Sequence, residues 1–576
     1  INRNKKISFK FNGKKYSGYE GDTLASALIA NGVHLVGRSF KYHRPRGFFG
    51  AGVDEPYAIV QMNRNNEVDP NVRATEQELF EGLEAKSVNC WPNVDFDIGA
   101  INNFLGKFFP AGFYYKTFMW PKSFWYKVYE PIIRKAAGFG AASIKHDKER
   151  YEHKYEYCDL LITGSGPSGL ASAYAAAKNG AKVILAEDKS RFGGSLLTSE
   201  VTIGNQNGKE WAEKIITELK SMPNVIVKNR SQVFGYYDHN MLVMSERVSD
   251  HLPKTEKYTP KQRLWYIRAK EVIISSGSIE RPLVFGNNDT PGVMLSSAAK
   301  EYLKVYGVLV GKKPLVFTNN DSGYETAIEF KKNGIDPIVL DTRKNPNSEI
   351  IKEAKDLNIN IKFSYVVVAA KGYKKVKSAD IAKISDDKKK LSNIENIGCD
   401  CICVSGFWTP TIHLASQSGN KTKFKDEIDA FIPSQSKQKE TTLGSANGIF
   451  TLEETLKTSF EKGSELSRQI TNRENKIAVP AVVEKKSSNH DKFWCVPLPE
   501  RKNYKRFLDF QNDVSVSDIQ LALREGYRSI EHVKRYTTLG MATDQGRTSN
   551  LNGLQLVSDI ENKVVPQVGH TTFRPP

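Results

Sequence analysis

Residues 164–169 read GSGPSG and join two segments of contrasting pattern. A short apolar run of the kind that forms buried strands precedes them at residues 159–163, and an Ala-rich helical stretch follows as far as Gly180. A second apolar run, residues 182–186, ends at Glu187. A G-x-G-x-x-G turn between a strand and a helix, with a carboxylate closing the next strand, predicts a dinucleotide-binding Rossmann unit.

Each residue of this turn has a physical role in holding a dinucleotide. Gly164 permits the tight turn, Gly166 lets the main chain approach a pyrophosphate, and Gly169 allows close packing of helix on strand. Pro167 and Ser168 open the helix, whose N-terminus offers free N–H groups and a positive dipole end. These residues are therefore predicted nucleotide contacts.

Glu187 indicates which dinucleotide binds. Its carboxylate can accept hydrogen bonds from the adenosine ribose 2′-OH, and its charge would repel a 2′-phosphate. We therefore predict NAD, although Lys189 and Arg191 nearby leave NADP open. A glycine pair, Gly193 and Gly194, follows and is typical of flavoproteins with two dinucleotide-binding domains.

A second strand-turn-helix pattern begins at Leu315 but keeps only the last glycine of the motif, Gly323. Asp321 would place a negative charge beside any pyrophosphate, which favours a scaffold role over a second nucleotide site. Apolar runs ending in small residues at 273–277 and 403–406 are expected to close the first nucleotide-binding domain around this inserted unit.

The start of the chain has a different pattern. Alternating residues 6–11 and the turn Asn12-Gly13 predict a β-hairpin. Asp22 is the predicted N-cap of a helix over residues 23–29. A hairpin followed by a helix indicates a β-grasp, ferredoxin-like module.

A chain of 576 residues is too long for one hydrophobic core, so we predict an α/β multidomain protein. Its predicted parts are a β-grasp module (1–95), an aromatic-rich connector (96–155), a NAD-binding Rossmann domain of the two-dinucleotide-binding flavoprotein type (156–310 and 395–482), a nested degenerate Rossmann unit (311–394) and a small helical module (495–576).

The connector is rich in Phe, Tyr and Trp, but lysines interrupt it and argue against a membrane anchor. We expect its aromatic side chains to pack on the chain's own domains. The alternative is a protein partner, because such residues also anchor interfaces.

Composition excludes several classes of function. The net charge is +18, but the lysines are scattered and form no one-sided helical stripe, so nucleic acid is not an expected partner. Cys399, Cys401 and Cys403 share one face of a strand and are predicted core residues, and no metal site is expected. Few cysteines and the lack of a signal peptide or long apolar run predict a cytoplasmic protein. No nucleophile motif of a hydrolase is present.

Three segments, residues 36–47, 110–118 and 531–538, resemble the alpha subunit of heterotetrameric sarcosine oxidase. Together with the nucleotide motif, the resemblance covers nearly the whole chain. It implies a cytoplasmic complex of alpha, beta, gamma and delta subunits that oxidatively demethylates sarcosine to glycine, with O2 as acceptor. It also implies FAD on the beta subunit, FMN at the alpha-beta interface, NAD on the alpha subunit, and a C-terminal domain where tetrahydrofolate takes up the one-carbon unit.

The resemblance also implies particular NAD contacts. They fall on Gly166, Ser168, Glu187, Asp188, Lys189, Ser195, Val233, Ser445, Phe450 and Leu452.

The sequence departs from its iron-binding relatives at two places. No cysteine lies in residues 37–47, and Asp509, Gln511, Asp544 and Ser549 stand where a helical iron-sulfur module has cysteines, so no cluster is expected. The segment Phe573-Arg574-Pro575-Pro576 resembles the entry into the folate domain, which lies outside this sequence. Because the sequence starts at Ile1 instead of Met, it does not establish the natural ends of the chain.

No residue stands out as a catalytic acid, base or nucleophile. The alternatives are therefore a non-catalytic NAD-holding scaffold, or a subunit of a related amine, proline or opine dehydrogenase. A basic, hydroxyl-rich stretch that includes Lys534, Arg535 and Thr548 is the predicted contact with FMN. Two predicted helices, 517–525 and 529–536, also resemble a helix-turn-helix, but the second lacks a base-reading face.

Overall fold

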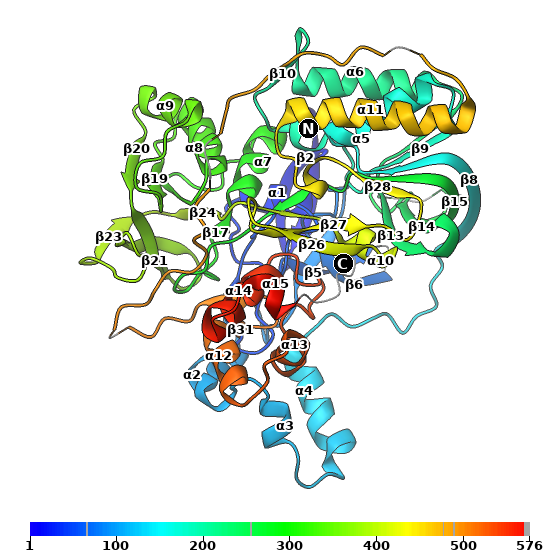
Figure 1. The fold of residues 1–576 in the computed structure, drawn as a ribbon. Helices are drawn as coiled ribbons and strands as arrows, with labels where there is room; N and C mark the ends of the chain where they lie inside the picture. The colour runs from blue at the N-terminus through cyan, green and yellow to red at the C-terminus, as the bar shows by residue number, and fades with distance from the viewer. Residues whose placement is uncertain (65–66, 254–255, 476, 488–489, 501, 570–576) are drawn as a thin grey trace. The chain divides into compact units, whose positions relative to one another are not determined.

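The computed structural model describes residues 1–576 apart from 65–66, 254–255, 476, 488–489, 501 and 570–576 (Figure 1). The chain divides into two compact units. Unit 1 comprises the described parts of Ile1–Asp147, Glu280–Phe407 and Ser487–Thr571, and unit 2 those of Lys148–Ile279 and Trp408–Lys486. The expected tail at Phe573–Pro576 lies outside the described residues. Within the described chain, every helix is too short or too polar to cross a bilayer.

Unit 2 is built on one twisted sheet with the strand order β12-β9-β8-β15-β14-β13. Its parallel part consists of β12 (Val225–Lys228), β9 (Val183–Ala186), β8 (Tyr151–Thr163), β15 (Gln262–Ile274) and β28 (Glu440–Thr442). An antiparallel meander, β13 (Ser231–Tyr237) and β14 (Met241–Arg247), extends it.

Three helices pack on this sheet: α5 (Pro167–Lys178), α6 (Gly208–Ser221) and α11 (Leu452–Thr471). Leu170 of α5, Trp211 of α6 and Phe460 of α11 are buried with residues of β8 and β9 in a single apolar core. The strand-turn-helix-strand unit predicted from residues 159–187 is therefore present, with α5 between β8 and β9. Figure 1 shows α5, α6 and α11 running side by side.

Unit 1 begins with the predicted β-grasp sheet, ordered β2-β1-β7-β5-β6. Its strands are β1 (Asn2–Phe11), β2 (Lys14–Glu20), β5 (Ile59–Arg64), β6 (Glu67–Arg73) and β7 (Glu84–Ser87). Asn12 and Gly13 both have positive φ, as a tight hairpin turn requires. Helix α1 (Leu24–Ala30) is capped by Thr23, so the predicted N-cap Asp22 is wrong by one residue. Asp22 instead accepts a hydrogen bond from the Ser26 hydroxyl.

A second, wholly parallel sheet in unit 1 has the order β17-β24-β18-β19-β20. Its strands are β17 (Val293–Leu295), β24 (Cys401–Ser405), β18 (Pro314–Thr318), β19 (Ile338–Asp341) and β20 (Asn360–Phe363). Helices α7 (Ser296–Tyr306), α8 (Ser322–Lys332) and α9 (Glu349–Asp356) accompany it, followed by a meander of β21 (Tyr365–Gly372), β22 (Val376–Lys383) and β23 (Glu395–Gly398).

The position of β24 corrects one expectation. The strand around Cys403 was predicted to close the first nucleotide-binding domain, but it lies between β17 and β18 of the second sheet. Cys399, Cys401 and Cys403 are buried in the core there, as expected of apolar side chains.

The last part of unit 1 is the helical module. It consists of β30 (Phe507–Asp509), β31 (Val514–Ser515), α12 (Val516–Arg524), α13 (Ile530–Thr537), α14 (Asn550–Glu561) and α15 (Val565–Val568). The predicted helices at 517–525 and 529–536 correspond to α12 and α13, each within one residue at both ends.

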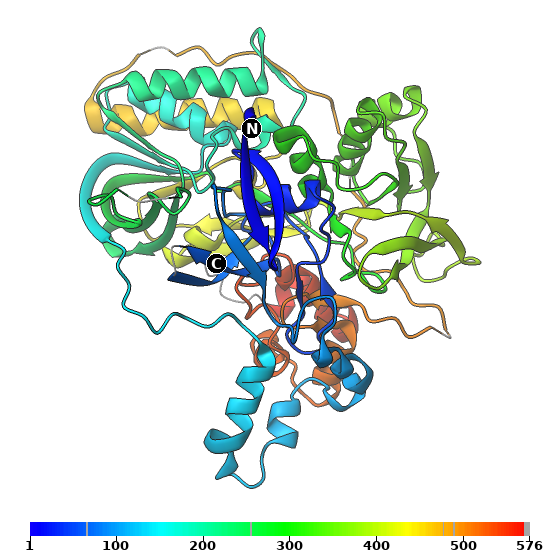
Figure 2. The same cartoon turned by 180° about the vertical axis from the view of Figure 1, so that it is seen from behind.

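Residues 96–139 form short helices, named here the arm: α2 (Ile101–Phe104), α3 (Phe113–Thr117), a π-helical turn (Trp125–Tyr129) and α4 (Glu130–Ala137). In Figures 1 and 2, α3 and α4 extend beyond α13 of the same unit.

Candidate dinucleotide site

The turn after β8 has the geometry that a dinucleotide requires. Gly164 has φ +93°, and a Cβ there would lie 2.4 Å from the carbonyl oxygen of Ser275. A Cβ on Gly169 would lie 1.8 Å from the carbonyl oxygen of Gly164, because the first turn of α5 packs directly on the loop. A Cβ on Gly166 would meet no protein atom within 4 Å. Gly166 therefore faces open space, which leaves its main chain accessible to a pyrophosphate.

The N-terminus of α5 lies at this open position. Gly166 is its N-cap and supplies no side-chain cap, and Pro167 occupies the first turn. Gly194 has φ +54° and lies against Gly166, since a Cβ on it would be 2.8 Å from the Gly166 Cα. The predicted glycine pair thus borders the turn, and Gly193 donates its N–H to the carbonyl oxygen of Ser165 at 3.1 Å.

Glu187, at the end of β9, is buried and turned toward the same loop. Its Oε2 accepts the main-chain N–H of Ser165 at 2.8 Å and the Ser165 hydroxyl at 2.6 Å, and its Oε1 accepts the N–H of Lys189 at 3.0 Å. Burial, reinforced by the charge of Asp188, raises the pKa of Glu187 to about 8. The Glu187 carboxyl group is thus positioned at the nucleotide turn by Ser165, a contact that the motif alone did not reveal.

The other predicted NAD residues lie at different distances from the turn. Ser168 directs its hydroxyl to that of Ser459 on α11, at 2.8 Å, and a Cβ on Gly444 would lie 3.0 Å from the Ser168 Cβ. The segment that holds Ser445, Phe450 and Leu452 therefore begins beside α5. Val233 belongs to β13, whose first residue, Ser231, donates its N–H to the carbonyl oxygen of Glu187 at 2.7 Å.

Ser275 is a further residue that shapes the turn and that the sequence motif does not indicate. Its hydroxyl donates to the carbonyl oxygens of Thr163 and Gly164, at 2.8 and 3.1 Å, and so fixes the start of the turn. The signal was present in the sequence, because Ser275 ends the apolar run that forms β15 beside β8.

The corresponding loop of the second Rossmann unit is filled by the chain's own residues. The Asn319 amide donates to the carbonyl oxygens of Asp491 and Phe493, at 2.9 and 2.8 Å. Asp321 forms an ion pair with Arg343 at 2.9 Å, and Arg343 also pairs with Asp341 at the end of β19. These contacts agree with the scaffold role expected of this unit.

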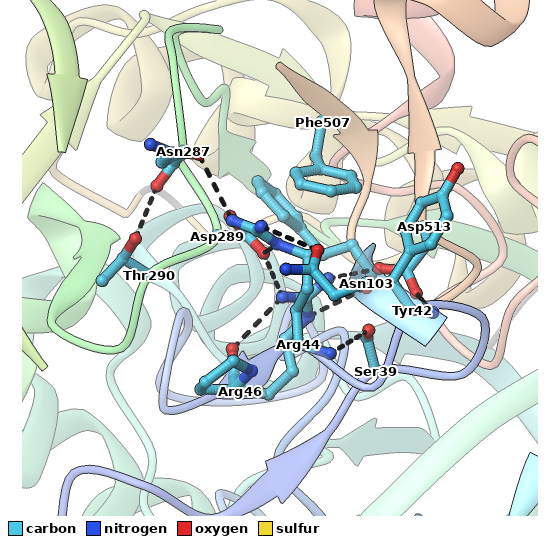
Figure 3. Close-up of polar contacts among 12 residues, drawn as sticks. Ser39, Tyr42, Arg44, Arg46, Asn103, Asn287, Asp289, Thr290, Phe507 and Asp513 are labelled. Carbon is cyan, nitrogen blue, oxygen red and sulfur yellow. Dashed lines mark hydrogen bonds and ion pairs between the residues drawn. The ribbon is translucent and has the colours of Figure 1, made fainter. Parts of the chain in front are cut away.

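A buried charge cluster in unit 1 joins the β-grasp module to two distant segments (Figure 3). Arg44 contacts both carboxylate oxygens of Asp289, at 2.6 and 2.8 Å, and Arg46 pairs with Asp289 and Asp513. The Asp513 carboxylate also accepts the N–H of Tyr42 at 2.9 Å. Burial opposes ionisation of Asp289, but the two guanidinium groups lower its pKa to about 2. Segment 36–47, which carries the family resemblance, therefore holds unit 1 together.

The predicted FMN contacts lie in the helical module. Arg535 is exposed on α13, and Lys534 precedes it. Thr548 is buried, and its hydroxyl donates to the Asp544 carboxylate at 3.3 Å, so this side chain points inward.

The sarcosine oxidase alpha subunit of Rhizobium meliloti is 43% identical over all of this chain, and that of Corynebacterium sp. strain U-96 is 30% identical. Residues 503–576 match the sarcosine oxidase A3 domain. The chain is homologous to sarcosine oxidase alpha subunits along its entire length. It spans 57% and 56% of the length of these two relatives, so the match is to part of each.

Two further family models match this chain, in agreement with its fold. Residues 158–434 match the pyridine nucleotide-disulphide oxidoreductase family, and residues 4–90 match a 2Fe-2S iron-sulfur cluster binding domain. The crystal structure of L-proline dehydrogenase from P. horikoshii has the same fold, with a TM-score of 0.64, 18% identity and coverage of 100% of this chain and 96% of that one. The predicted fold class is thus confirmed.

The residues present do not fit a 2Fe-2S cluster. Such a cluster takes four cysteine thiolates, whereas residues 4–90 contain Cys90 alone. Among the described residues, no group of three His, Cys, Asp or Glu side chains is placed to hold a metal ion. The β-grasp module has a buried carboxylate instead: Glu55 accepts the N–H groups of Phe49, Gly50, Tyr57 and Ala58 at 2.7–3.0 Å.

The four positions predicted to correspond to cysteines of a helical iron-sulfur module are buried polar residues: Asp509, Gln511, Asp544 and Ser549. Asp509 accepts the N–H of Gly540, and Gln511 accepts that of Thr543, at 2.8 and 3.0 Å. Burial, followed by the charge of Asp544, raises the pKa of Asp509 to about 7. These side chains connect two loops through main-chain hydrogen bonds.

Proposed function

We propose that this chain is the NAD-binding portion of an alpha subunit in a sarcosine oxidase complex. The observation that carries the proposal is the 43% identity over the whole chain to such a subunit. In the proposed reaction, sarcosine is oxidatively demethylated to glycine with O2 as acceptor, and the one-carbon unit passes to tetrahydrofolate. FAD would belong to the beta subunit, and FMN to the interface between alpha and beta.

The open face of Gly166 supports NAD at the turn of unit 2, because a pyrophosphate can approach where no Cβ or neighbouring side chain lies. The first turn of α5 would direct its N–H groups at the phosphates. Glu187, Asp188 and Lys189 would face the adenosine ribose, and Ser195 would follow the glycine pair. A bound NAD supplies a nicotinamide ring that can accept hydride.

Unit 2 would contribute binding and orientation. Ser165 holds the Glu187 carboxylate at the turn, and Ser275 fixes the loop before α5. With both contacts in place, the site is formed before the nucleotide arrives, and less ordering entropy is lost on binding.

Two measurements test the proposal. Native mass spectrometry of the purified chain, with cofactor extraction, should find one NAD per chain and no FAD. Co-expression with beta, gamma and delta subunits should then give turnover of sarcosine in preference to dimethylglycine or proline. A yellow, FAD-loaded chain would overturn the NAD assignment, and preferred turnover of proline would overturn the substrate assignment.

A further inference from the structure

The arm exposes an unusual amount of apolar surface. Fourteen of its 44 residues are aromatic, against 10% in the whole chain. The exposed fraction is 84% for Phe104, 73% for Phe108, 84% for Trp120, 83% for Tyr126 and 62% for Ile132. The expectation that the connector packs on the chain's own domains is therefore wrong for these side chains.

The arm divides its rings into two sets. Phe113 contacts Phe109 and Phe118 with ring centroids 5.4 and 6.0 Å apart, and Phe118 contacts Tyr129 at 5.2 Å. These rings form the internal packing of the arm. Phe104, Phe108, Trp120, Tyr126 and Ile132, named here the outward set, are left facing solvent.

Both ends of the arm are fixed within unit 1. The His43 ring lies between the Asp97 carboxylate, at 2.7 Å, and the carbonyl oxygen of Ala136, at 3.1 Å, so one side chain joins the start and the end of the arm. Farther along, Lys116 forms an ion pair with Glu525 of the helical module. An arm held at its base presents the outward set without a large ordering cost.

The size and charge of this surface indicate its occupant. A buried aromatic side chain contributes roughly 150–250 Å², so the outward set supplies on the order of 800 Å², the share of one partner in a stable protein interface. The arm contains six Lys or Arg residues and two Asp or Glu residues. Lys122, Lys127 and Lys135 are exposed beside the outward set, and a partner with carboxylates around an apolar groove would complement them.

We propose that the arm is a docking surface for an acidic protein subunit. Its helices, α3 with five residues and α4 with eight, are too short to offer the continuous apolar face by which amphipathic helices lie on lipid. Protein grooves, by contrast, accommodate separate aromatic anchors. The choice of binding partner in the test rests on the proposed function.

The test uses the full chain and the purified beta subunit of the same complex. Trp120→Ala/Tyr126→Ala/Ile132→Ala removes three outward anchors, and we expect affinity for the beta subunit to fall at least 100-fold. Lys122→Glu/Lys127→Glu/Lys135→Glu should lower affinity at least tenfold and reverse its dependence on salt, because the acidic partner would then face like charges. Tyr258→Ala/Val483→Ala, which removes two exposed side chains outside the arm, is the matched control and should bind normally. Circular dichroism melting should be unchanged in all three.

Three results would overturn the docking inference. They are unchanged affinity of both arm variants, arm-dependent self-association or binding to anionic phosphatidylserine vesicles in place of the beta subunit, and failure of the native chain to bind the beta subunit. NAD content, measured on the same samples, judges the proposed function separately, because the arm and the nucleotide turn share no residue.

Discussion

The Glu187 carboxylate accepts both the main-chain N–H and the hydroxyl of Ser165, at 2.8 and 2.6 Å. The first residue inside the glycine-rich turn and the carboxylate at the end of the neighbouring strand are thereby fixed to each other. The motif therefore has a folding role as well as a binding role, and variants at its different positions should separate the two.

Gly166→Ala should weaken nucleotide binding without destabilising the fold. The added Cβ meets no protein atom and Gly166 has an extended conformation, so the free energy of unfolding should stay within about 0.5 kcal/mol of the native value. The methyl group would occupy the path of the pyrophosphate, and NAD affinity should fall at least tenfold, which is about 1.4 kcal/mol.

Gly169→Ala is the matched comparison. Its Cβ would lie 1.8 Å from the carbonyl oxygen of Gly164, so this variant should be destabilised by about 1–3 kcal/mol. Calorimetric titration with NAD and urea unfolding measure both effects. Equal NAD affinity of Gly166→Ala and the native chain would contradict the assigned site.

Glu187 should make the stability of unit 2 fall as pH rises. Its pKa of about 8 lies above its ordinary value of 4.5, so the folded state binds the proton more tightly than the unfolded state. The contribution is complete below about pH 4.5 and is lost as pH rises to about 8. In Glu187→Gln this part of the pH dependence should disappear. Thermal unfolding of both proteins between roughly pH 5 and pH 9, the range that contains the titration, measures this difference. Parallel pH profiles of the native chain and Glu187→Gln would contradict the prediction.

Asp289 should have the opposite dependence. Because its pKa is lowered to about 2 from 3.8, its stabilising contribution is present above pH 3.8 and is lost as pH falls toward 2. Asp289→Asn leaves Arg44 and Arg46 without their shared charge and should destabilise unit 1 by about 3–5 kcal/mol. Asp95→Asn removes an exposed ion pair with Lys374 and should cost less than about 1 kcal/mol. Similar losses of unfolding free energy in both variants would show that burial does not strengthen the contribution of the Asp289 ion pairs to stability.

Local patterns in the sequence were sufficient to predict several elements. The turn at residues 164–169, the hairpin at Asn12 and Gly13, and α12 and α13 each follow from glycine placement and periodicity. The strands that pair with β24 could not be predicted from the sequence, because an apolar parallel strand has the same pattern in either sheet. The exposure of Trp120 and Tyr126 could not be predicted either, since aromatic residues are equally suited to a core and to an interface.

Iron reconstitution should leave the chain without a cluster. Incubation with ferrous iron and sulfide under reducing, anaerobic conditions should give iron well below one atom per chain, because residues 4–90 supply one thiol and Asp509 and Asp544 are carboxylates held by main-chain N–H groups. Cys90→Ser should behave identically. Incorporation near two iron atoms per chain, lost in Cys90→Ser, would contradict the expectation.

In the proposed function, FMN lies where the alpha and beta subunits meet. Arg535 is exposed on α13 with Lys534 beside it, and a pair of cations suits a flavin phosphate through charge-assisted hydrogen bonds. In a chain co-expressed with the beta subunit, Lys534→Ala/Arg535→Ala should lower FMN content and sarcosine turnover together. Thr548→Val is the control, because that hydroxyl is buried against Asp544: it should lower the melting temperature and leave FMN content unchanged. If the double variant retains full FMN content and turnover, Lys534 and Arg535 do not contact the flavin.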